Sequence, residues 1–298
     1  MKDLNGRVAA ITGAGSGIGR ALATELARRG THLALSDVDE AGLAGTVALC
    51  EGHGVKVTSQ RVDVADRAAV HAWADQVVDD HGRVNLVVNN AGVALLATID
   101  AMSYDDFDWL MNINFWGVVH GTKAFLPHLK AAGEGHIVNL SSVFGLVSVP
   151  SQAAYNSAKF AVRGFTDALR MELEIEPCGV SCTTVHPGGI KTNIARSARI
   201  DESSRVMTGR GHRGAPAADP QGDPGDHGDL LAGDLAGDFD KLAATSPDKA
   251  ARQILAAVEA DRRRVLVGPD AKVIDVVGRL PARLYQRALV RGARRRRR

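Results

Sequence analysis

A tyrosine and a lysine four positions apart are the residues of this chain that most directly suggest chemistry. Tyr155 and Lys159 lie in the stretch SQAAYNSAKFAVRGFTDALRMEL, where apolar residues recur at helical spacing. Residues four apart share one helix face, so the phenol and the ammonium point in the same direction. A free tyrosine has a pKa of about 10, and a neighbouring cation favours its phenolate. Tyr155 is therefore a candidate acid and base for a substrate oxygen, although such a pair taken alone is more often structural.

A glycine-rich turn lies near the start of the chain. The stretch TGAGSGIG, from Thr12 to Gly19, follows the apolar run RVAAI and precedes the helix-like segment RALATELARRG. Its glycines allow a sharp turn and let backbone N–H groups approach a pyrophosphate at the start of a helix. Ile18 stands where the common G-x-G-x-x-G spacing has its third glycine. The stretch by itself fits a nucleotide-binding turn and a purely structural turn equally well.

A carboxylate at the end of the next apolar run favours the nucleotide. Asp37 closes the run HLALSD, at roughly the ~20-residue offset where an acidic residue hydrogen-bonds the ribose hydroxyls of NAD. A carboxylate there also repels the 2′-phosphate of NADP, and neither the turn nor the residues directly after Asp37 include a lysine or arginine to attract it. We therefore expect NAD as the cofactor. The alternative for Asp37 is a solvated loop charge.

The elements that must position these groups alternate along the chain. Continuous apolar strands between amphipathic helices indicate parallel strands that are covered on both faces. With right-handed crossovers, such strands form a doubly wound sheet. We predict a single α/β domain of the Rossmann type with a parallel seven-stranded sheet. The candidate strands are RVAAIT, HLALSD, VKVTSQRVD, VNLVVN, HIVNLSS, VSCTTVHP and RVLVG.

Composition sets further limits. The 298 residues are 45% hydrophobic and 23% charged, which are ordinary values for a globular protein. No apolar run approaches the ~20 residues that span a bilayer, and the N-terminus MKDLNGRVAA lacks the apolar core of a secretory signal, so we expect a cytoplasmic location. Cys50, Cys178 and Cys182 form neither a C-x-x-C pair nor a zinc spacing. We expect buried or idle thiols and no metal.

Two segments stand apart from the alternating pattern. Residues 209–240, with GDPGDHGD and AGDLAGD, are rich in glycine and aspartate but lack the strict period of calcium-binding repeats, so we expect a loop insertion there. The dinucleotide-binding catalytic domain is predicted to span residues 1–268 around this insertion. Residues 269–298 are predicted to be a basic tail, because residues 261–298 hold 13 Lys and Arg against 3 Asp and Glu.

The tail combines apolar residues with its charge. Its arginines fall every fourth residue from Arg279 to Arg291, and Pro281 predicts two short helices rather than one long helix. One interpretation is that the first part packs on the domain while the arginines are solvated. The other is an interfacial helix on anionic lipid. We do not expect nucleic acid as the partner, because Tyr285 is the only aromatic residue of the tail. The apolar positions are Val273, Val276, Val277, Leu280, Leu284 and Leu289.

Several motifs occur in the order and at the spacing of one enzyme family. The pattern Thr12-Gly13-x-x-x-Gly17-x-Gly19 is followed by NNAG at 89–92, the serine of NLSS at 142, YNSAK at 155–159 and HPGGIKT at 186–192. On these motifs the chain resembles the short-chain dehydrogenase/reductase family over about residues 5–195, and more loosely over 241–268. The extension after Thr192 and the ending VLVGPDAKVIDVVGRLPARLYQRAL are most similar to actinobacterial secondary-alcohol dehydrogenases.

The resemblance implies roles for four catalytic residues. Ser142 would hydrogen-bond the substrate oxygen, and Tyr155 would transfer the proton. Lys159 would favour the phenolate and hold the nicotinamide ribose. The backbone carbonyl of Asn114, in MNINFWG, would hold a water for proton relay through Lys159, with Asn112 as a nearby rival.

The resemblance also implies a set of cofactor-binding residues. Asp63 resembles the family's acidic residue beside adenine, and Asn90 resembles the family residue that steadies the central strand. A purely structural role suits both residues equally well. Ile190 and Thr192 are expected near the nicotinamide carboxamide. His186 occupies a position that varies in the family, so we do not expect it to be catalytic. The full set is Gly13, Ser16, Gly17, Ile18, Gly19, Asp37, Asp63, Val64, Asn90, Ala91, Gly92, Tyr155, Lys159, Pro187, Gly188, Ile190 and Thr192.

These observations predict an NAD-dependent oxidoreductase that interconverts a hydrophobic secondary alcohol and its ketone. The apolar stretches VALLAT, after NNAG, and VFGLVSVP, after Ser142, favour the hydrophobic substrate. The apolar helices around Trp109 and Phe165 resemble helices that pair in family members, so a homodimer or homotetramer is expected. Two alternatives remain: a cofactor-binding scaffold without turnover, which the intact Ser142, Tyr155 and Lys159 disfavour, and a peripheral membrane protein whose tail carries its function.

Overall fold

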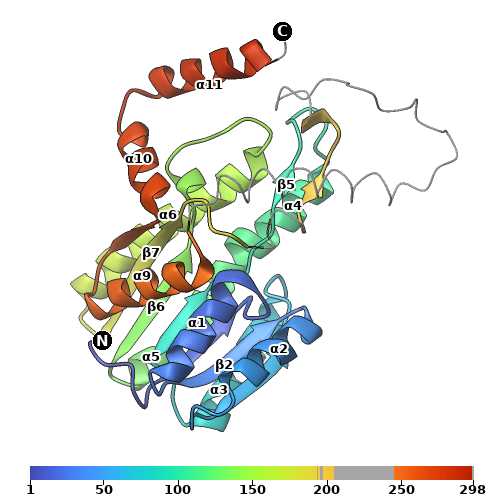
Figure 1. Ribbon diagram of the computed structural model, residues 1–298. Coiled ribbons are helices and arrows are strands. Elements are labelled where there is room, and N and C mark those ends of the chain that lie inside the picture. Colours follow the sequence, from blue (N-terminus) through green and yellow to red (C-terminus); the bar gives the residue numbers. More distant parts are fainter. Residues whose placement is uncertain (193, 195–196, 205–244, 297–298) are drawn as a thin grey trace, which may run out of the picture.

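The structure is a computed structural model that describes residues 1–192, 194, 197–204 and 245–296 (Figure 1). The predicted glycine- and aspartate-rich insertion at 209–240 lies outside these described residues. The chain leaves the described part after β8 and returns at Thr245, which forms a parallel bridge with Ile190. The segments on the two sides of the insertion are therefore neighbours in the fold.

A sheet of seven parallel strands forms the centre of the molecule, in the order β3-β2-β1-β4-β6-β7-β9. This confirms the predicted α/β fold of the Rossmann type. The central strands are buried along their whole length, as their uninterrupted apolar runs predict. The strands are β1 (Val8–Thr12), β2 (His32–Asp37), β3 (Val57–Arg61), β4 (Leu86–Asn89), β6 (Gly135–Leu140), β7 (Val180–Pro187) and β9 (Arg264–Val267).

Helices cover both faces of this sheet (Figure 1). On one face, α1 (Gly17–Arg28), α2 (Glu40–Cys50) and α9 (Pro247–Glu259) bury their apolar sides in one core cluster. On the other face, α3 (Arg67–His81), α5 (Gly117–Ala131) and α6 (Ala153–Ile175) bury theirs in a second cluster. This doubly wound arrangement places the loops after the strands at one edge of the sheet, where ligands bind in such folds.

Side-chain caps determine where several helices begin. A short polar side chain accepts a hydrogen bond from a backbone N–H of the first turn, which would otherwise lack a partner. Asp39 caps α2, Asp66 caps α3 and Ser246 caps α9. Ser103 does the same for α4 (Tyr104–Met111), which is followed by the π-helical turn η1 (Asn112–Trp116).

A buried hydrogen-bond network locks α6 onto the sheet. The Asn89 amide donates to Asn139 Oδ1 at 2.8 Å, and the Asn139 amide donates to Thr166 Oγ1 at 3.0 Å. The three residues belong to β4, β6 and α6. A Cβ on Gly121 of α5 would clash with the Asn89 side chain, so the close approach of α5 to this network needs glycine. The position of α6, which carries Tyr155 and Lys159, is set by these contacts.

A second, two-stranded sheet pairs β5 (Leu95–Leu96) with β8 (Arg199–Ile200). It joins the loop after β4 to the segment after β7. Neither strand was expected from the sequence, because two residues are too few to show a strand periodicity. The pair adds a small flap beside the carboxyl end of the main sheet.

The chain ends in two helices, α10 (Pro269–Gly278) and α11 (Ala282–Arg296), with Pro281 between them as predicted (Figure 1, red). Ala271 and Asp275 of α10 are buried, so this helix packs on the protein. The boundary proposed at residue 268 stays a prediction. No helix in the described part of the chain is long and apolar enough to span a bilayer.

The three cysteines are free thiols, and Cys50 and Cys182 are buried. Burial raises the pKa of Cys50 to about 11 and that of Cys182 to about 12. Both thiols are therefore protonated near neutral pH and poorly reactive. This agrees with the expectation of idle thiols.

Candidate active site

The structure brings Ser142, Tyr155 and Lys159 together at the carboxyl end of β6. Ser142 begins the short 3₁₀ turn η2 (Val143–Gly145), and its side chain lies close enough to the Tyr155 hydroxyl to lower the pKa of that phenol by hydrogen bonding. The Lys159 ammonium lies 5.5 Å from the centroid of the Tyr155 ring. The phenol therefore has a hydroxyl partner on one side and a cation nearby, as the one-face spacing on α6 predicts.

Two hydrogen bonds hold the first turns of α6 against the end of β6. The Ser141 hydroxyl donates to the carbonyl oxygen of Lys159 at 2.8 Å, and Lys159 Nζ donates to the carbonyl oxygen of Leu140 at 2.9 Å. A Cβ on Gly145 would lie 2.6 Å from the Lys159 carbonyl oxygen, so η2 can approach α6 this closely only with glycine at that position. These contacts fix the distance between Ser142 and Tyr155.

Burial shifts the two titratable groups of this cluster in opposite directions. It raises the pKa of Tyr155 to about 12, an effect that the hydrogen bond to Ser142 partly offsets. It lowers the pKa of Lys159 to about 8. Burial penalises the charged form of each group, which explains the opposite signs. Perturbed pKa values of this kind gather at functional sites.

Asn114 borders the same cluster, whereas its rival Asn112 is exposed. The buried Asn114 side chain accepts a hydrogen bond from the Val93 N–H and donates one to the Val93 carbonyl, both at 2.8 Å. A Cβ on Gly92 would lie 3.2 Å from Asn114 Oδ1 and 3.7 Å from Lys159 Nζ. Asn114 sits in η1, and π-helical turns often occur at functional sites. The geometry favours Asn114 over Asn112 as the residue beside Lys159.

The glycine turn forms a cradle that side chains would fill. Gly13 and Gly17 have positive φ angles of 64° and 53°. A Cβ on Gly13 would lie 2.8 Å from the Ala91 Cα, and one on Gly19 would clash with the Gly13 carbonyl. The turn runs into the N-terminus of α1, where exposed Ser16 is the cap residue, and Ile18 packs on the core. These features fit the pyrophosphate of a dinucleotide.

The NNAG motif is tied directly to this turn. The Asn90 side chain donates to the carbonyl oxygens of Thr12 at 2.9 Å and Gly13 at 3.0 Å. In return, Thr12 Oγ1 accepts from the N–H groups of Asn90 and Ala91. These bonds give Asn90 a structural function at the end of β1. They also place Ala91 and Gly92 between the glycine turn and Lys159.

Asp37 lies at the end of β2 and faces the glycine turn. Its Oδ2 accepts from the Gly15 N–H at 2.7 Å, and its Oδ1 accepts from the Asp39 N–H at 3.0 Å. The prediction of NAD rested on the absence of a lysine or arginine from the turn and from the residues directly after Asp37. Arg20 of α1, which follows the turn, donates to the carbonyl oxygens of Gly15 and Gly42. Within the described residues no ion pair joins Asp37 to a cation. Asp37 and Arg20 therefore both contact Gly15 without pairing with each other.

Asp63 and Val64 follow β3 at the same edge of the sheet. Asp63 is exposed, and its Oδ1 accepts from the Ala65 N–H at 2.9 Å. Val64 is buried, and a Cβ on Gly117 would lie 2.8 Å from its Cγ2. The Asp63 side chain is thus open to solvent, whereas the Val64 side chain packs against the start of α5.

The loop after β7 reaches back over the glycine turn. A Cβ on Gly17 would lie 3.1 Å from the Thr192 methyl group. The Ile190 side chain is buried in the core, so its backbone is the part that can face a cofactor. Pro187 ends the strand, and the Gly188 N–H donates to Val267 of β9 at 2.9 Å. The predicted nicotinamide segment is therefore held by the C-terminal part of the domain.

Asp270, at the first turn of α10, holds this loop and was not identified from the sequence. Its Oδ2 accepts from the Gly189 N–H at 2.6 Å, and a Cβ on Gly188 would clash with its carboxylate. Its Oδ1 is buried with no hydrogen-bond partner in the described structure. The Pro-Asp pair that opens α10 is an ordinary helix-start signal, which conceals this long-range contact.

His186 is buried, and its ring is hydrogen-bonded to the backbone of Ser142. Its Nδ1 donates to the carbonyl oxygen of Ser142 at 2.8 Å, and burial lowers its pKa to about 4. The imidazole is therefore neutral near pH 7. It supports the backbone of Ser142, which agrees with the expectation that it is not catalytic.

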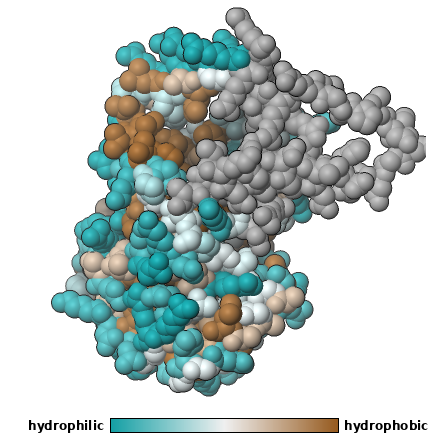
Figure 2. Space-filling view, viewed as in Figure 1, coloured by the Kyte–Doolittle hydropathy of each residue, from teal (hydrophilic) through white to brown (hydrophobic). Residues whose placement is uncertain are grey.

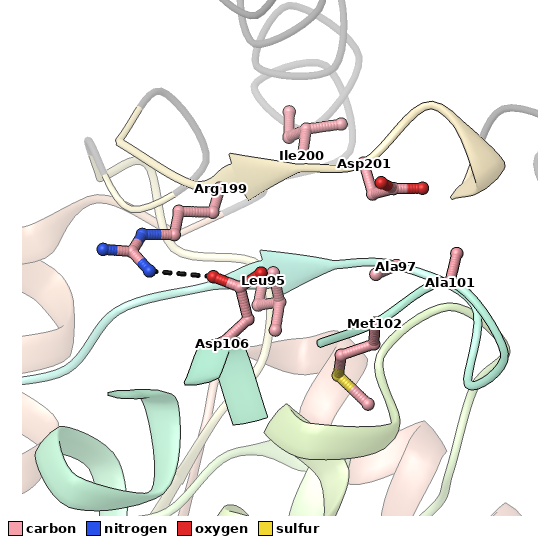
Figure 3. A pocket seen from close by; sticks show the side chains of 8 residues that line it. All are labelled: Leu95, Ala97, Ala101, Met102, Asp106, Arg199, Ile200 and Asp201. Atoms are coloured by element: carbon pink, nitrogen blue, oxygen red, sulfur yellow. Dashed lines mark hydrogen bonds and ion pairs between the residues drawn. The ribbon is translucent and has the colours of Figure 1, made fainter. Parts of the chain in front are cut away.

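A separate cavity of about 170 Å³ lies between β5, β8 and α4, and the catalytic residues do not line it (Figure 3). Arg199 closes one side with an ion pair to Asp106 at 2.8 Å. The Arg199 guanidinium also lies 3.7 Å from the centroid of the Trp109 ring. Arg199 thus clamps the segment after β7 to α4, and it covers Trp109.

Comparisons with known proteins agree with this geometry. The family model for the short chain dehydrogenases matches residues 7–203. SadH of Mycobacterium tuberculosis, an oxidoreductase by name, is 47% identical over 293 residues, which cover 98% of this chain and 97% of SadH. Estradiol 17-beta-dehydrogenase 11 of Homo sapiens is 39% identical over 201 residues, which cover 66% of each chain. A short-chain dehydrogenase/reductase from Burkholderia phymatum, solved in complex with NAD, is 33% identical with a TM-score of 0.78 over 92% of each chain.

The chain therefore belongs to the short-chain dehydrogenase/reductase family, which confirms the resemblance found in its motifs. It is an oxidoreductase of that family, and it shares its fold with proteins that were solved with NAD bound. The glycine cradle, Asp37 and the loop after β7 are the parts of this chain that fit such a cofactor.

Replacing Asp270 by alanine tests the support of the loop after β7. The variant loses a charged acceptor, and we expect NADH binding to weaken at least about tenfold. Asp270→Asn keeps an oxygen for the Gly189 N–H and should bind more nearly like the wild type. Binding is measured by fluorescence titration, with a thermal melt to show that each variant is folded.

Asp248→Ala is the matched control. Asp248 follows a proline at the start of α9, as Asp270 does in α10, but it is exposed. NADH binding should be unchanged in this control. Unaltered binding by a folded Asp270→Ala variant, or equal weakening in both alanine variants, would contradict the function given to Asp270.

Proposed function

We propose that this chain is an NAD-dependent oxidoreductase that interconverts a hydrophobic secondary alcohol and its ketone, with Tyr155 as the general acid and base. The observation that carries the proposal is the convergence of Ser142, Tyr155 and Lys159 at the end of β6. When bound, NAD supplies the hydride acceptor for oxidation and, in its reduced form, the hydride donor for reduction. Ser142 orients the substrate oxygen, and Tyr155 moves the proton.

The opposed pKa shifts set the pH range of this proton transfer. Tyr155 is shifted to about 12 and Lys159 to about 8. Neighbouring groups that interact lose their protons as a pair, so the first proton leaves near the lower value. In the form with one proton left, Tyr155 can act as a phenolate while Lys159 is an ammonium. The pair therefore gains a basic form as the pH rises through about 8.

The apolar surroundings of Tyr155 support a hydrophobic substrate. Tyr155 packs against a buried cluster that includes Leu95, Leu110 and Ala154. Phe144 meets its ring edge-on, with the ring centroids 6.2 Å apart. A polyol or an anionic substrate would lose its hydration here without regaining equivalent hydrogen bonds.

We further propose a cytoplasmic homodimer or homotetramer. Trp109 and Phe165, the residues that suggested pairing, are half-buried within the chain, and Arg199 covers Trp109. Exposed apolar residues on α6 are instead Phe160, Met171 and Ile175, and Trp116 is exposed in the nearby turn η1. Apolar exposure along one helix supports an interface between copies. A peripheral contact with anionic membrane through α10 and α11 is also part of the proposal.

Tyr155→Phe tests the assignment of the acid and base. The variant keeps the ring but loses the hydroxyl, and we expect turnover to fall at least about 10²-fold with NADH binding nearly unchanged. In the wild type, kcat/KM for alcohol oxidation should rise with pH and level off above about 8. Steady-state rates with a panel of secondary alcohols give both results.

Tyr104→Phe is the matched control. Tyr104 is 89% exposed on α4, whereas Tyr155 packs against a buried cluster. Its turnover should equal that of the wild type. A Tyr155→Phe variant with full turnover would show that the phenol is not the proton-transferring group.

Asp37→Asn tests the preference for NAD. Asparagine keeps an oxygen acceptor for the Gly15 N–H but removes the charge that repels a 2′-phosphate. We expect the ratio of kcat/KM for NAD to that for NADP to fall at least about tenfold in the variant. A wild-type enzyme that prefers NADP, or a variant whose ratio does not change, would be inconsistent with this function of Asp37.

A further inference from the structure

Helix α10 exposes large apolar side chains and buries a carboxylate, which is the reverse of an ordinary surface helix. Its inward face carries Ala271, Asp275 and Gly278, which lie within about 60° of one another at 100° per residue. Its outward face carries larger apolar residues. A surface helix normally buries its apolar face and exposes its polar face. The exposed apolar residues of α10 are Val273 and Val276, and exposed Leu280 follows directly after the helix.

Ionic contacts fix α10 in this orientation. Asp275 accepts hydrogen bonds from Arg279 at 2.7 and 3.1 Å and pairs with Arg264 of β9 at 3.2 Å. Asp270 anchors the N-terminus of the helix through the Gly189 N–H. Rotation of α10 to bury its valines would break the Asp275–Arg264 pair and the Asp270–Gly189 bond, and it would expose a buried carboxylate. The apolar face is therefore held toward solvent.

Helix α11 continues this apolar surface and adds charge to it. Six exposed apolar side chains between Val273 and Val290 have between 41 and 64% of their surface exposed, and Figure 2 shows apolar surface at α10 beside hydrophilic surface along α11. Arg283, Arg287 and Arg291 share one face of α11, because they lie four residues apart. The exposed apolar residues of α11 are Leu284, Leu289 and Val290.

The charge of this segment selects its partner. Residues 276–298 contain nine arginines and no aspartate or glutamate. A second copy of the same segment would be repelled by this charge. Nucleic acid would satisfy the arginines but would leave the valines and leucines exposed, and Tyr285 is the only aromatic residue for base stacking. An anionic lipid surface accommodates both the arginines and the apolar side chains, because the arginines contact headgroups while the valines and leucines enter the acyl region.

The two helices also contact the loop that follows the catalytic serine. A Cβ on Gly278 would lie 3.0 Å from the Leu146 carbonyl oxygen, so α10 rests directly on the end of η2. The Ser148 N–H donates to the Tyr285 hydroxyl of α11 at 3.5 Å. A surface bound by α10 and α11 would therefore lie beside the loop that follows Ser142.

We propose that α10 and α11 bind an anionic lipid surface and place the catalytic site beside it, so that a hydrophobic alcohol or ketone dissolved in the lipid reaches Tyr155 directly. This inference rests on the proposed function for its substrate class. The lipid contact itself depends only on the exposed valines and leucines and on the arginines. Binding should weaken as salt rises, since exposed charges are screened over about 10 Å at 0.1 M.

The test measures co-sedimentation of the full chain with vesicles of phosphatidylglycerol and, separately, of phosphatidylcholine. The wild type should bind the anionic vesicles at least about tenfold more tightly than the neutral ones. A triple variant, Arg283→Gln, Arg287→Gln and Arg291→Gln, should lose at least about tenfold of that binding. A second variant, Val276→Ser with Leu280→Ser, should bind more weakly while keeping its charge.

The matched control removes three arginines elsewhere. Arg28, Arg67 and Arg252 are exposed on α1, α3 and α9, and their triple change to Gln should alter vesicle binding less than about twofold. The lipid proposal is overturned if the wild type fails to bind phosphatidylglycerol vesicles, if it binds both vesicle types equally, or if both triple variants bind alike. It is also overturned if duplex DNA displaces the protein from the vesicles at equal charge concentration.

Oxidation of a short, water-soluble secondary alcohol without vesicles separates the two proposals. The tail variants should oxidise it like the wild type, because the substituted residues lie outside the catalytic site. With a long-chain secondary alcohol dissolved in phosphatidylglycerol vesicles, the wild type should exceed the arginine variant in kcat/KM at least about fivefold. Equal rates there would overturn delivery from the lipid. Absence of all alcohol oxidation with intact vesicle binding would contradict the proposed function and leave the lipid contact standing.

Discussion

The catalytic arrangement depends on the hydrogen bond between the Ser141 hydroxyl and the Lys159 carbonyl oxygen, 2.8 Å long and buried. It joins the end of β6 to the second turn of α6, and the Lys159 ammonium returns a second bond to the Leu140 carbonyl oxygen. Because Ser142 follows directly on the strand side and Tyr155 lies one turn back on the helix side, this tie sets their separation. The Asn89–Asn139–Thr166 network anchors the same helix deeper in the sheet. A proton-transfer group needs this rigidity, since a small displacement would break its hydrogen bond to the substrate.

The cofactor side of the site is built from segments far apart in the chain. The glycine turn after β1 is braced by Asn90, and Asp37 closes it from the end of β2. The loop after β7 is held from the other direction by Asp270 of α10. Helix α10 therefore contacts the cofactor loop with its first turn and the serine loop with its last. Any force on the C-terminal helices acts on both halves of the site.

Much of the fold was predictable because it follows from local patterns. Uninterrupted apolar runs identify the seven strands, and Pro281 identifies the break between α10 and α11. The four-residue spacing of Tyr155 and Lys159 predicts from the sequence alone that they share one helix face. The pairing of β5 with β8, the π-helical turn at Asn114 and the contact of Asp270 with Gly189 were not predictable. Each joins residues without a periodic signal or depends on tertiary packing, so no window of sequence reveals it.

The most direct test of the proposed chemistry follows the hydrogen on the carbinol carbon. A hydrophobic secondary alcohol with deuterium at that carbon is oxidised in ordinary water with NAD, and the reduced cofactor is analysed by mass spectrometry. Direct transfer between substrate and cofactor, with Tyr155 taking only the hydroxyl proton, predicts one deuterium in every molecule of NADH formed. NADH that carries hydrogen from the solvent instead, or no NADH from any alcohol of a broad panel, would contradict the assignment of this site.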